Sequence, residues 1–299
     1  MARSSEFVAR ESVARGAARD LLQEAGVESL PVDPFAIASA LRPPIGVVER
    51  RLEEDVYGAC CLVSNRFVIL VSPSCPSSGH KRFTVAHELG HYRIDGHVEA
   101  MFSGGDQEVW SKGAHFQQGA TWVEREADYF ASELLMPEHL VRPLLRGCNS
   151  MEVVRRIEDA CGVSLTAAAI TMVRLTRDPL AALVSKDGVL EWPAVSESLR
   201  TYPWARMRQK GEWAPPRSAT RRLGRDPSSV LEGAEDSEEG LLCEWFPEAP
   251  DETLVTEEAV GLGAYGRVLT LLVPDSLPDE DEEQERAWRS RRSDVDEEV

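Results

Sequence analysis

Residues 83–97, FTVAHELGHYRIDGH, contain three of the chain's six histidines together with one glutamate and one aspartate. His87 and His91 are four positions apart, which on a helix is only about 40° around the axis, so both imidazoles leave the same face. Two imidazole nitrogens on one face are typical ligands of Zn²⁺. Glu88, next to the first histidine, is then placed to take a proton from a zinc-bound water instead of binding the metal.

A catalytic zinc site needs a third protein ligand, and two alternatives are open. The first is His97, six residues after His91, where the HExxHxxGxxH pattern has its third histidine. That pattern turns at a glycine three residues after the second histidine, whereas this chain has the β-branched Ile94 there, and Gly96 follows only later. The second is Glu124, which would complete a ligand set of two histidines and one glutamate.

The segment EREAD places Glu124 and Asp128 four residues apart, on one face of an expected helix and beside its apolar stripe. Asp128 can accept a hydrogen bond from the ring N–H of a ligand histidine and so fix its tautomer. The competing interpretation of this face is a solvated charged surface, which we expect for Arg125 and Glu126. From the residues alone, Glu124 is as compatible with such a surface as with a metal site.

Peptide hydrolysis at such a site also requires a donor to the oxyanion that develops on the substrate carbonyl. Tyr92, His97 and His115 are the candidates for oxyanion or substrate contacts, and the sequence does not choose among them. We also expect a substrate strand to add to an edge of the hairpin formed by residues 59–71.

Several elements are expected to position these residues. Apolar residues at helical spacing predict helices. Two apolar runs on either side of Ser64, Asn65 and Arg66 predict a hairpin with its turn at these three residues. Ser77 or Ser78 is expected to cap the histidine helix, and Pro137 to end the later one. In chain order the predicted elements are a helix over 5–25, a short helix from Pro34, strands over 59–63 and 67–71, the histidine helix, a Gly-rich loop over 103–121 and a helix over 122–136.

Beyond residue 145 the pattern changes twice. Residues 151–176 predict two helices joined by a turn at Gly162, an outline compatible with a helix-turn-helix. From about residue 179 short apolar runs at 181–185, 189–192, 241–246, 253–260 and 267–273 predict strands. We therefore expect four regions: a metallopeptidase domain (1–145), a helical segment (146–178), a β-rich domain with a sensory or regulatory role (179–274), and a disordered acidic tail (275–299).

Composition narrows the function classes. The formal net charge of −18 disfavours direct nucleic-acid binding, which depends on Lys and Arg. No apolar run approaches the roughly 20 residues that span a bilayer, and the N-terminus has no secretory pattern. None of the six cysteines forms a CxxC pair, so we expect free thiols and a cytoplasmic location.

Two motifs, in this order, resemble those of the ImmA/IrrE-type metallopeptidases: RFTVAHELGHY (82–92) and EREADYFASELLMP (124–137). The segment PVDPFAIASAL (31–41) and the following hairpin are similar as well, and the resemblance covers about residues 15–195. It implies a gluzincin-like site in which His87, His91 and Glu124 bind Zn²⁺ and Glu88 is the general base. It thereby favours Glu124 over His97, which is left to support the ligands or to anchor the loop, and it places Asp128 where the family often has Asn or Asp.

We therefore expect an α+β protein with a mostly helical, zincin-like catalytic domain and a small antiparallel β-sheet. The resemblance further implies a zinc endopeptidase whose partner is a helix-turn-helix repressor of the XRE type, because family members cut such repressors and release stress-response or mobile-element genes. The alternative hypothesis is a non-proteolytic regulator or ligand sensor that uses the helix pair and the β-rich domain. A structural zinc is a third hypothesis, but structural sites usually have four Cys or His ligands.

Overall fold

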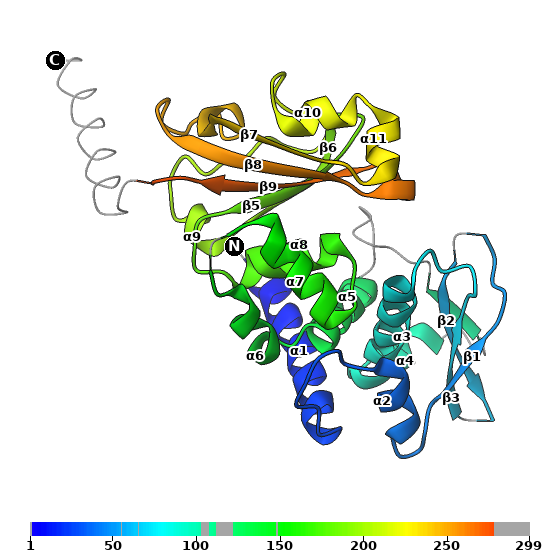
Figure 1. Cartoon of the computed structure of the whole chain (residues 1–299). Coiled ribbons are helices and arrows are strands. Elements are labelled where there is room, and N and C mark those ends of the chain that lie inside the picture. The colour runs from blue at the N-terminus through cyan, green and yellow to red at the C-terminus, as the bar shows by residue number, and fades with distance from the viewer. Residues whose placement is uncertain are drawn as a thin grey trace. The chain divides into compact units, whose positions relative to one another are not determined.

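The structure is a computed structural model that describes residues 2–54, 56–64, 66–102, 108–111, 122–147 and 149–277 (Figure 1). The chain divides into two compact units: residues up to 144 with 156–167, and residues 145–155 with those from 168 onward. Helices and two β-sheets are both present, which confirms the expected α+β class. Within the described ranges, no helix is both long and apolar enough to cross a membrane.

The first unit contains the elements expected around the histidine motif. Asp33 caps the short helix α2 by accepting hydrogen bonds from the N–H groups of Phe35 and Ala36, and Ser77 caps α3, as one of the two predicted caps. The elements are α1 (Ala2–Glu24), α2 (Pro34–Ala40), β1 (Gly46–Glu49), β2 (Gly58–Val63), β3 (Arg66–Val71), α3 (Ser78–Arg93), α4 (His97–Phe102), β4 (Glu108–Ser111), α5 (Trp122–Leu135) and α6 (Glu138–Val141).

The sheet of the first unit has the strand order β1-β3-β2-β4. The predicted β2–β3 hairpin is present, but its loop is shorter than expected, because Arg66 already pairs with Val63. The expectation of a purely antiparallel sheet was wrong, since β1 runs parallel to β3. The expectation that a substrate strand adds to an edge of the hairpin was also wrong, because β1 already pairs with β3 and β4 with β2. Strand β4 lies in the segment that was expected to be a loop.

Helix α5 packs against both α1 and α3. Its predicted apolar stripe is buried, as Val123, Ala127, Phe130 and Leu134 are all less than 9% exposed. Glu133, also buried, accepts hydrogen bonds from Arg15 and Arg19 of α1. The stripe therefore fixes which face of α5 turns toward the histidine helix.

The second unit is built on an antiparallel sheet with the strand order β6-β5-β9-β8-β7. Its elements are β5 (Ala181–Lys186), β6 (Val189–Val195), α9 (Glu197–Arg200), α10 (Ala219–Gly224), α11 (Pro227–Glu232), β7 (Glu235–Leu241), β8 (Leu254–Gly261) and β9 (Val268–Pro274), with short 3₁₀ turns at η2 (Leu242–Glu244) and η3 (Gly263–Tyr265). The 3₁₀ turn η1 (Arg142–Leu145) and helices α7 (Met151–Cys161) and α8 (Leu165–Leu175) each contribute to both units.

The strand predicted over 241–246 was wrong. The buried side chains here are those of Leu242, Trp245 and Phe246, at positions i, i+3 and i+4. This is the spacing of a helical turn, and the 3₁₀ turn η2 provides it. The strand in this region is instead the acidic segment β7, which lies at the edge of the sheet and is largely exposed. An exposed edge tolerates charged side chains that would not fit a central strand.

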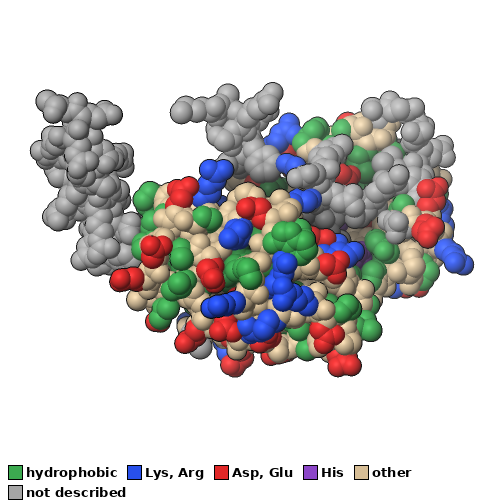
Figure 2. Space-filling view, turned by 90° about the horizontal axis from the view of Figure 1, so that it is seen from above, with side chains coloured by type: hydrophobic (Ala, Val, Ile, Leu, Met, Phe, Trp, Pro, Cys, Tyr) green, Lys and Arg blue, Asp and Glu red, His purple; other side chains and the backbone are tan. Residues whose placement is uncertain are grey.

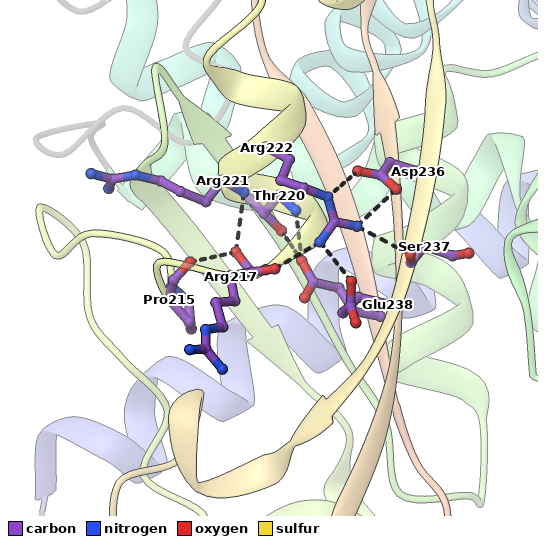
Figure 3. Close-up of polar contacts among 10 residues, drawn as sticks. Pro215, Arg217, Thr220, Arg221, Arg222, Asp236, Ser237 and Glu238 are labelled. Atoms are coloured by element: carbon purple, nitrogen blue, oxygen red, sulfur yellow. Dashed lines mark hydrogen bonds and ion pairs between the residues drawn. The ribbon is translucent and has the colours of Figure 1, made fainter.

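Surface charges are mixed in sign. On the face seen in Figure 2, Lys and Arg side chains are interspersed with Asp and Glu side chains. The network in Figure 3 shows such pairing in detail: Arg222 of α10 donates two hydrogen bonds of 2.9 Å to Asp236 and one of 2.6 Å to Glu238, both on β7. Through these contacts the short helix α10 is tied to the acidic edge of its sheet.

Candidate metal centre

Helix α3 carries the HExxH residues in its buried half. His87 is 5% exposed, and Glu88 and His91 are fully buried. The close approach of α5 depends on Gly90, because a Cβ at this position would lie 3.1 Å from Phe130 Cδ1 and 3.2 Å from the Ala127 Cα. The glycine within HELGH therefore has a packing role, which is to let the two helices come close enough for their side chains to meet.

Glu124 meets the two histidines at this helix contact. The Nε2 atoms of His87 and His91 are 3.0 Å apart; Glu124 Oε2 lies 3.2 Å from Nε2 of His87, and Glu124 Oε1 lies 3.6 Å from Nε2 of His91. A tetrahedral Zn²⁺ site with bonds of about 2.0–2.1 Å has edges of about 3.3 Å. These separations are close to such edges, and His87, His91 and Glu124 form a group that can hold a metal ion.

Asp128 lies one helical turn beyond Glu124, and its Oδ1 is 2.9 Å from His87 Nδ1. A proton on Nδ1 is donated to this carboxylate, so Nε2 is the ring nitrogen that faces Glu124 and His91. Burial lowers the pKa of His87, but the hydrogen bonds to Asp128 and Glu124 outweigh it and hold the pKa well above its usual value. For His91, burial and the neighbouring histidines lower the pKa well below the usual value.

His97 lies beside the metal group but outside it. Helix α3 ends at Arg93, its C-cap Ile94 has extended backbone, and Gly96, with φ of +85°, makes the turn that starts α4 at His97. The fully buried His97 places its Nδ1 3.2 Å from His91 Nδ1, on the opposite side of that ring from the metal group. The turn that Ile94 cannot make is thus made two residues later.

Glu126 was expected on a solvated face, and that expectation was wrong. It is only 5% exposed, and its Oε2 lies 2.9 Å from His97 Nε2. Glu126 is therefore buried through its contact with α4, next to the stripe residue Ala127. No sequence pattern indicates this pairing, because it depends on where α4 places His97.

Glu88 is enclosed by the start of β2. A Cβ at Gly58 would lie 2.6 Å from Glu88 Oε1 and 2.5 Å from Thr84 Cγ2. Cys60 follows on the same strand, and burial, then the nearby charge of Glu88, raise the pKa of its thiol. Sequence reasoning missed both residues, although a glycine inside a strand pattern is a general sign of close backbone approach.

Tyr92 and His115 are the two other candidates for oxyanion or substrate contacts. The ring of Tyr92 packs against Phe67 of β3, with centroids 5.3 Å apart. His115 lies outside the described residues.

Comparison with known proteins finds one family that matches the segment containing this site. Residues 41–172 match the family Peptidase_M78, described as the IrrE N-terminal-like domain. No curated protein matches the chain. The matched segment begins directly after α2, ends within α8 and includes both helices that carry the metal group. Residues 41–172 of this chain are thus similar to the IrrE N-terminal-like domain, which supports a metallopeptidase of the ImmA/IrrE type.

Proposed function

We propose that this chain is a zinc-dependent endopeptidase that hydrolyses a peptide bond in a protein substrate. The supporting observation is the convergence of His87, His91 and Glu124 from two helices, with donor atoms 3.0–3.6 Å apart. Three protein ligands of this kind are typical of catalytic zinc sites, in which a fourth position is kept for water or substrate. A closed structural site would require a fourth side-chain ligand, and the metal group of the described residues contains three.

Zinc held by these side chains would supply a Lewis acid that polarises the scissile carbonyl and lowers the pKa of water toward about 7. Glu88 takes the proton from the attacking water and later returns it to the leaving amine. Asp128 keeps the lone pair of His87 Nε2 available by holding the proton of Nδ1. Of the three candidates for the oxyanion donor, we retain Tyr92 and His115, since His91 and Glu126 occupy both ring nitrogens of His97.

We further propose that the substrate is a helix-turn-helix repressor of the XRE type, whose cleavage derepresses stress-response or mobile-element genes. This proposal is supported by the match of residues 41–172 to the Peptidase_M78 family. A repressor encoded next to this chain is the first substrate to test.

The test uses the purified full chain and that repressor, with cleavage products mapped by mass spectrometry. Native protein loaded with zinc is expected to cut the repressor at a defined bond, and a chelator should stop the reaction. Glu88→Gln should bind zinc with native stoichiometry yet cut at least about 100-fold more slowly, since it lacks the base. Glu99→Gln, the same change at an exposed position of α4, should leave both properties unchanged. Cleavage by Glu88→Gln at the native rate would refute the mechanism.

A further inference from the structure

The two histidines of the metal group are held by different means. His87 reaches a carboxylate directly, through the 2.9 Å contact between its Nδ1 and Asp128. Among the described residues, Nδ1 of His91 meets an imidazole in place of a carboxylate, since Nδ1 of His97 lies 3.2 Å away. A carboxylate then follows on the other side of His97, where Nε2 lies 2.9 Å from Glu126. The row Glu126–His97–His91 thus leads from an acid to the metal group.

The direction of these hydrogen bonds follows from the carboxylate. A neutral imidazole carries one proton, and an ionised carboxylate can only accept, so the proton of His97 is on Nε2 and is donated to Glu126. Nδ1 of His97 is then an acceptor, and the proton of His91 must be on its Nδ1 to meet it. This leaves Nε2 of His91 with a free lone pair, pointing toward His87 and Glu124.

The opposite tautomers of His97 and His91 are both disfavoured. If His97 carried its proton on Nδ1, its Nε2 lone pair would face the carboxylate of Glu126 at 2.9 Å, where two acceptors repel each other. His91 would then carry its proton on Nε2, the atom that the metal group needs as a ligand. The position of Glu126 therefore selects the tautomer of a histidine that it does not touch.

The acid at the start of the row is itself held in place. Arg10 of α1 lies 3.5 Å from Glu126, and its guanidinium stacks over the Trp122 ring at 4.3 Å. The same ring meets His97 edge to face, with centroids 5.5 Å apart. His97 is fully buried and Glu126 nearly so, which keeps water from competing for these hydrogen bonds.

We propose that His97 and Glu126 are positioning residues that fix the tautomer and ring orientation of His91, so that its Nε2 serves the metal. This inference rests on the proposed metal site and assigns His97 neither to the ligand set nor to substrate contact. It also explains why the chain returns at Gly96: the turn brings an imidazole to the side of His91 that faces away from the metal.

The first test measures the zinc dissociation constant by competition with a chromophoric chelator, without any substrate. His97→Phe should weaken zinc binding by about 10- to 100-fold, the usual effect of losing such a partner. Glu126→Gln keeps an oxygen that can accept from His97 Nε2 and should weaken binding less. His139→Phe makes the same change at an exposed site on α6 and should leave affinity native. Native affinity in folded His97→Phe would overturn the proposal.

The second test observes the tautomers directly and does not depend on a variant that folds. Long-range ¹H–¹⁵N correlation spectra of the native zinc-loaded protein should show His91 protonated on Nδ1 and His97 protonated on Nε2. His91 protonated on Nε2, or His97 on Nδ1, would refute the inference. Both tests are independent of peptide cleavage, so the positioning role can stand even if the endopeptidase proposal fails, and the reverse also holds.

Discussion

The backbone of Gly58 lies directly against the carboxylate of Glu88, so that a Cβ at residue 58 would come within 2.6 Å of Glu88 Oε1. Because Glu88 is fully buried, its carboxylate can avoid that Cβ only by moving most of an ångström from its present place. We predict that Gly58→Ala lowers kcat for peptide cleavage by about 100-fold, as misplaced catalytic groups do, with zinc affinity and KM close to native. Steady-state kinetics and chelator competition measure these quantities.

Two variants isolate the cause. Gly46→Ala, on β1 of the same sheet, adds a Cβ that meets nothing within 4 Å and should be native in activity. Thr84→Ser, combined with Gly58→Ala, removes the Cγ2 atom that the new Cβ would meet at 2.5 Å but leaves the contact with Glu88. If this double variant recovers full activity, Thr84 and not Glu88 explains the defect.

The parts of the fold that follow from local patterns could be predicted from the sequence. The stripe from Val123 to Leu134 repeats at helical spacing, and the two apolar runs of the hairpin flank a polar turn, so both elements follow from a few neighbouring residues. The spacing of His87 and His91 likewise requires only a helix to bring their rings together.

The parts that depend on contacts between distant segments could not be predicted. β1 pairs in parallel with β3, although β2 lies between them in the sequence. No local signal distinguishes this pairing from an antiparallel one. Glu126 looks like a surface residue until α4 places His97 against it. The role of Gly58 depends on a carboxylate thirty positions later in the chain. In each case the missing information was which segment lies opposite.

Glu124 and Asp128 should differ in how strongly they affect the metal. Glu124 faces the Nε2 atoms of both histidines, so Glu124→Ala removes a donor and should abolish stoichiometric zinc binding. Asp128 contacts only Nδ1 of His87, so Asp128→Asn should retain zinc with an affinity about 10- to 100-fold weaker. Metal content after dialysis and chelator competition measure the difference. Equal effects of the two variants would contradict the assignment of one as ligand and the other as support.

The buried thiols should be unreactive in the native protein. Burial raises the pKa of Cys161 to about 11, and burial together with Glu88 raises the pKa of Cys60 as well. At pH 8 only about one in a thousand thiols with a pKa of about 11 is ionised, and the thiolate is the reactive form. We predict that iodoacetamide labels the partly exposed Cys243 at least about 100-fold faster than Cys161. Mass spectrometry of labelling time courses measures the rates, and equal rates in folded protein would contradict the prediction.

Glu257 of β8 should make the stability of the second unit depend on pH. Its carboxylate is 3% exposed and accepts hydrogen bonds from the N–H and hydroxyl of Thr220, at 2.7 and 2.5 Å. Thr220 precedes Arg222 on α10 (Figure 3). Burial raises the pKa of Glu257 above its ordinary value of 4.5, although the hydrogen bonds from Thr220 and the charge of Arg222 act in the opposite direction.

A raised pKa means that the folded state binds a proton which the unfolded state has already lost. The contribution of Glu257 to the free energy of unfolding is therefore complete below pH 4.5 and is lost as pH rises through the folded-state pKa. Glu257→Gln keeps an oxygen for Thr220 and does not titrate. We predict that native stability minus variant stability falls between pH 4 and pH 7, with a slope of at most about 1.4 kcal/mol per pH unit.

Urea unfolding of the full chain at several pH values, followed by the fluorescence of the buried Trp204 and Trp245, measures this difference. Glu239→Gln makes the same change at an exposed position on the neighbouring strand β7 and controls for the general effect of removing one charge. Because only the buried carboxylate requires desolvation, the pH-dependent term should be specific to Glu257. A difference that stays constant across this range, or one that matches the Glu239 variant, would show that Glu257 titrates alike in the folded and unfolded chain.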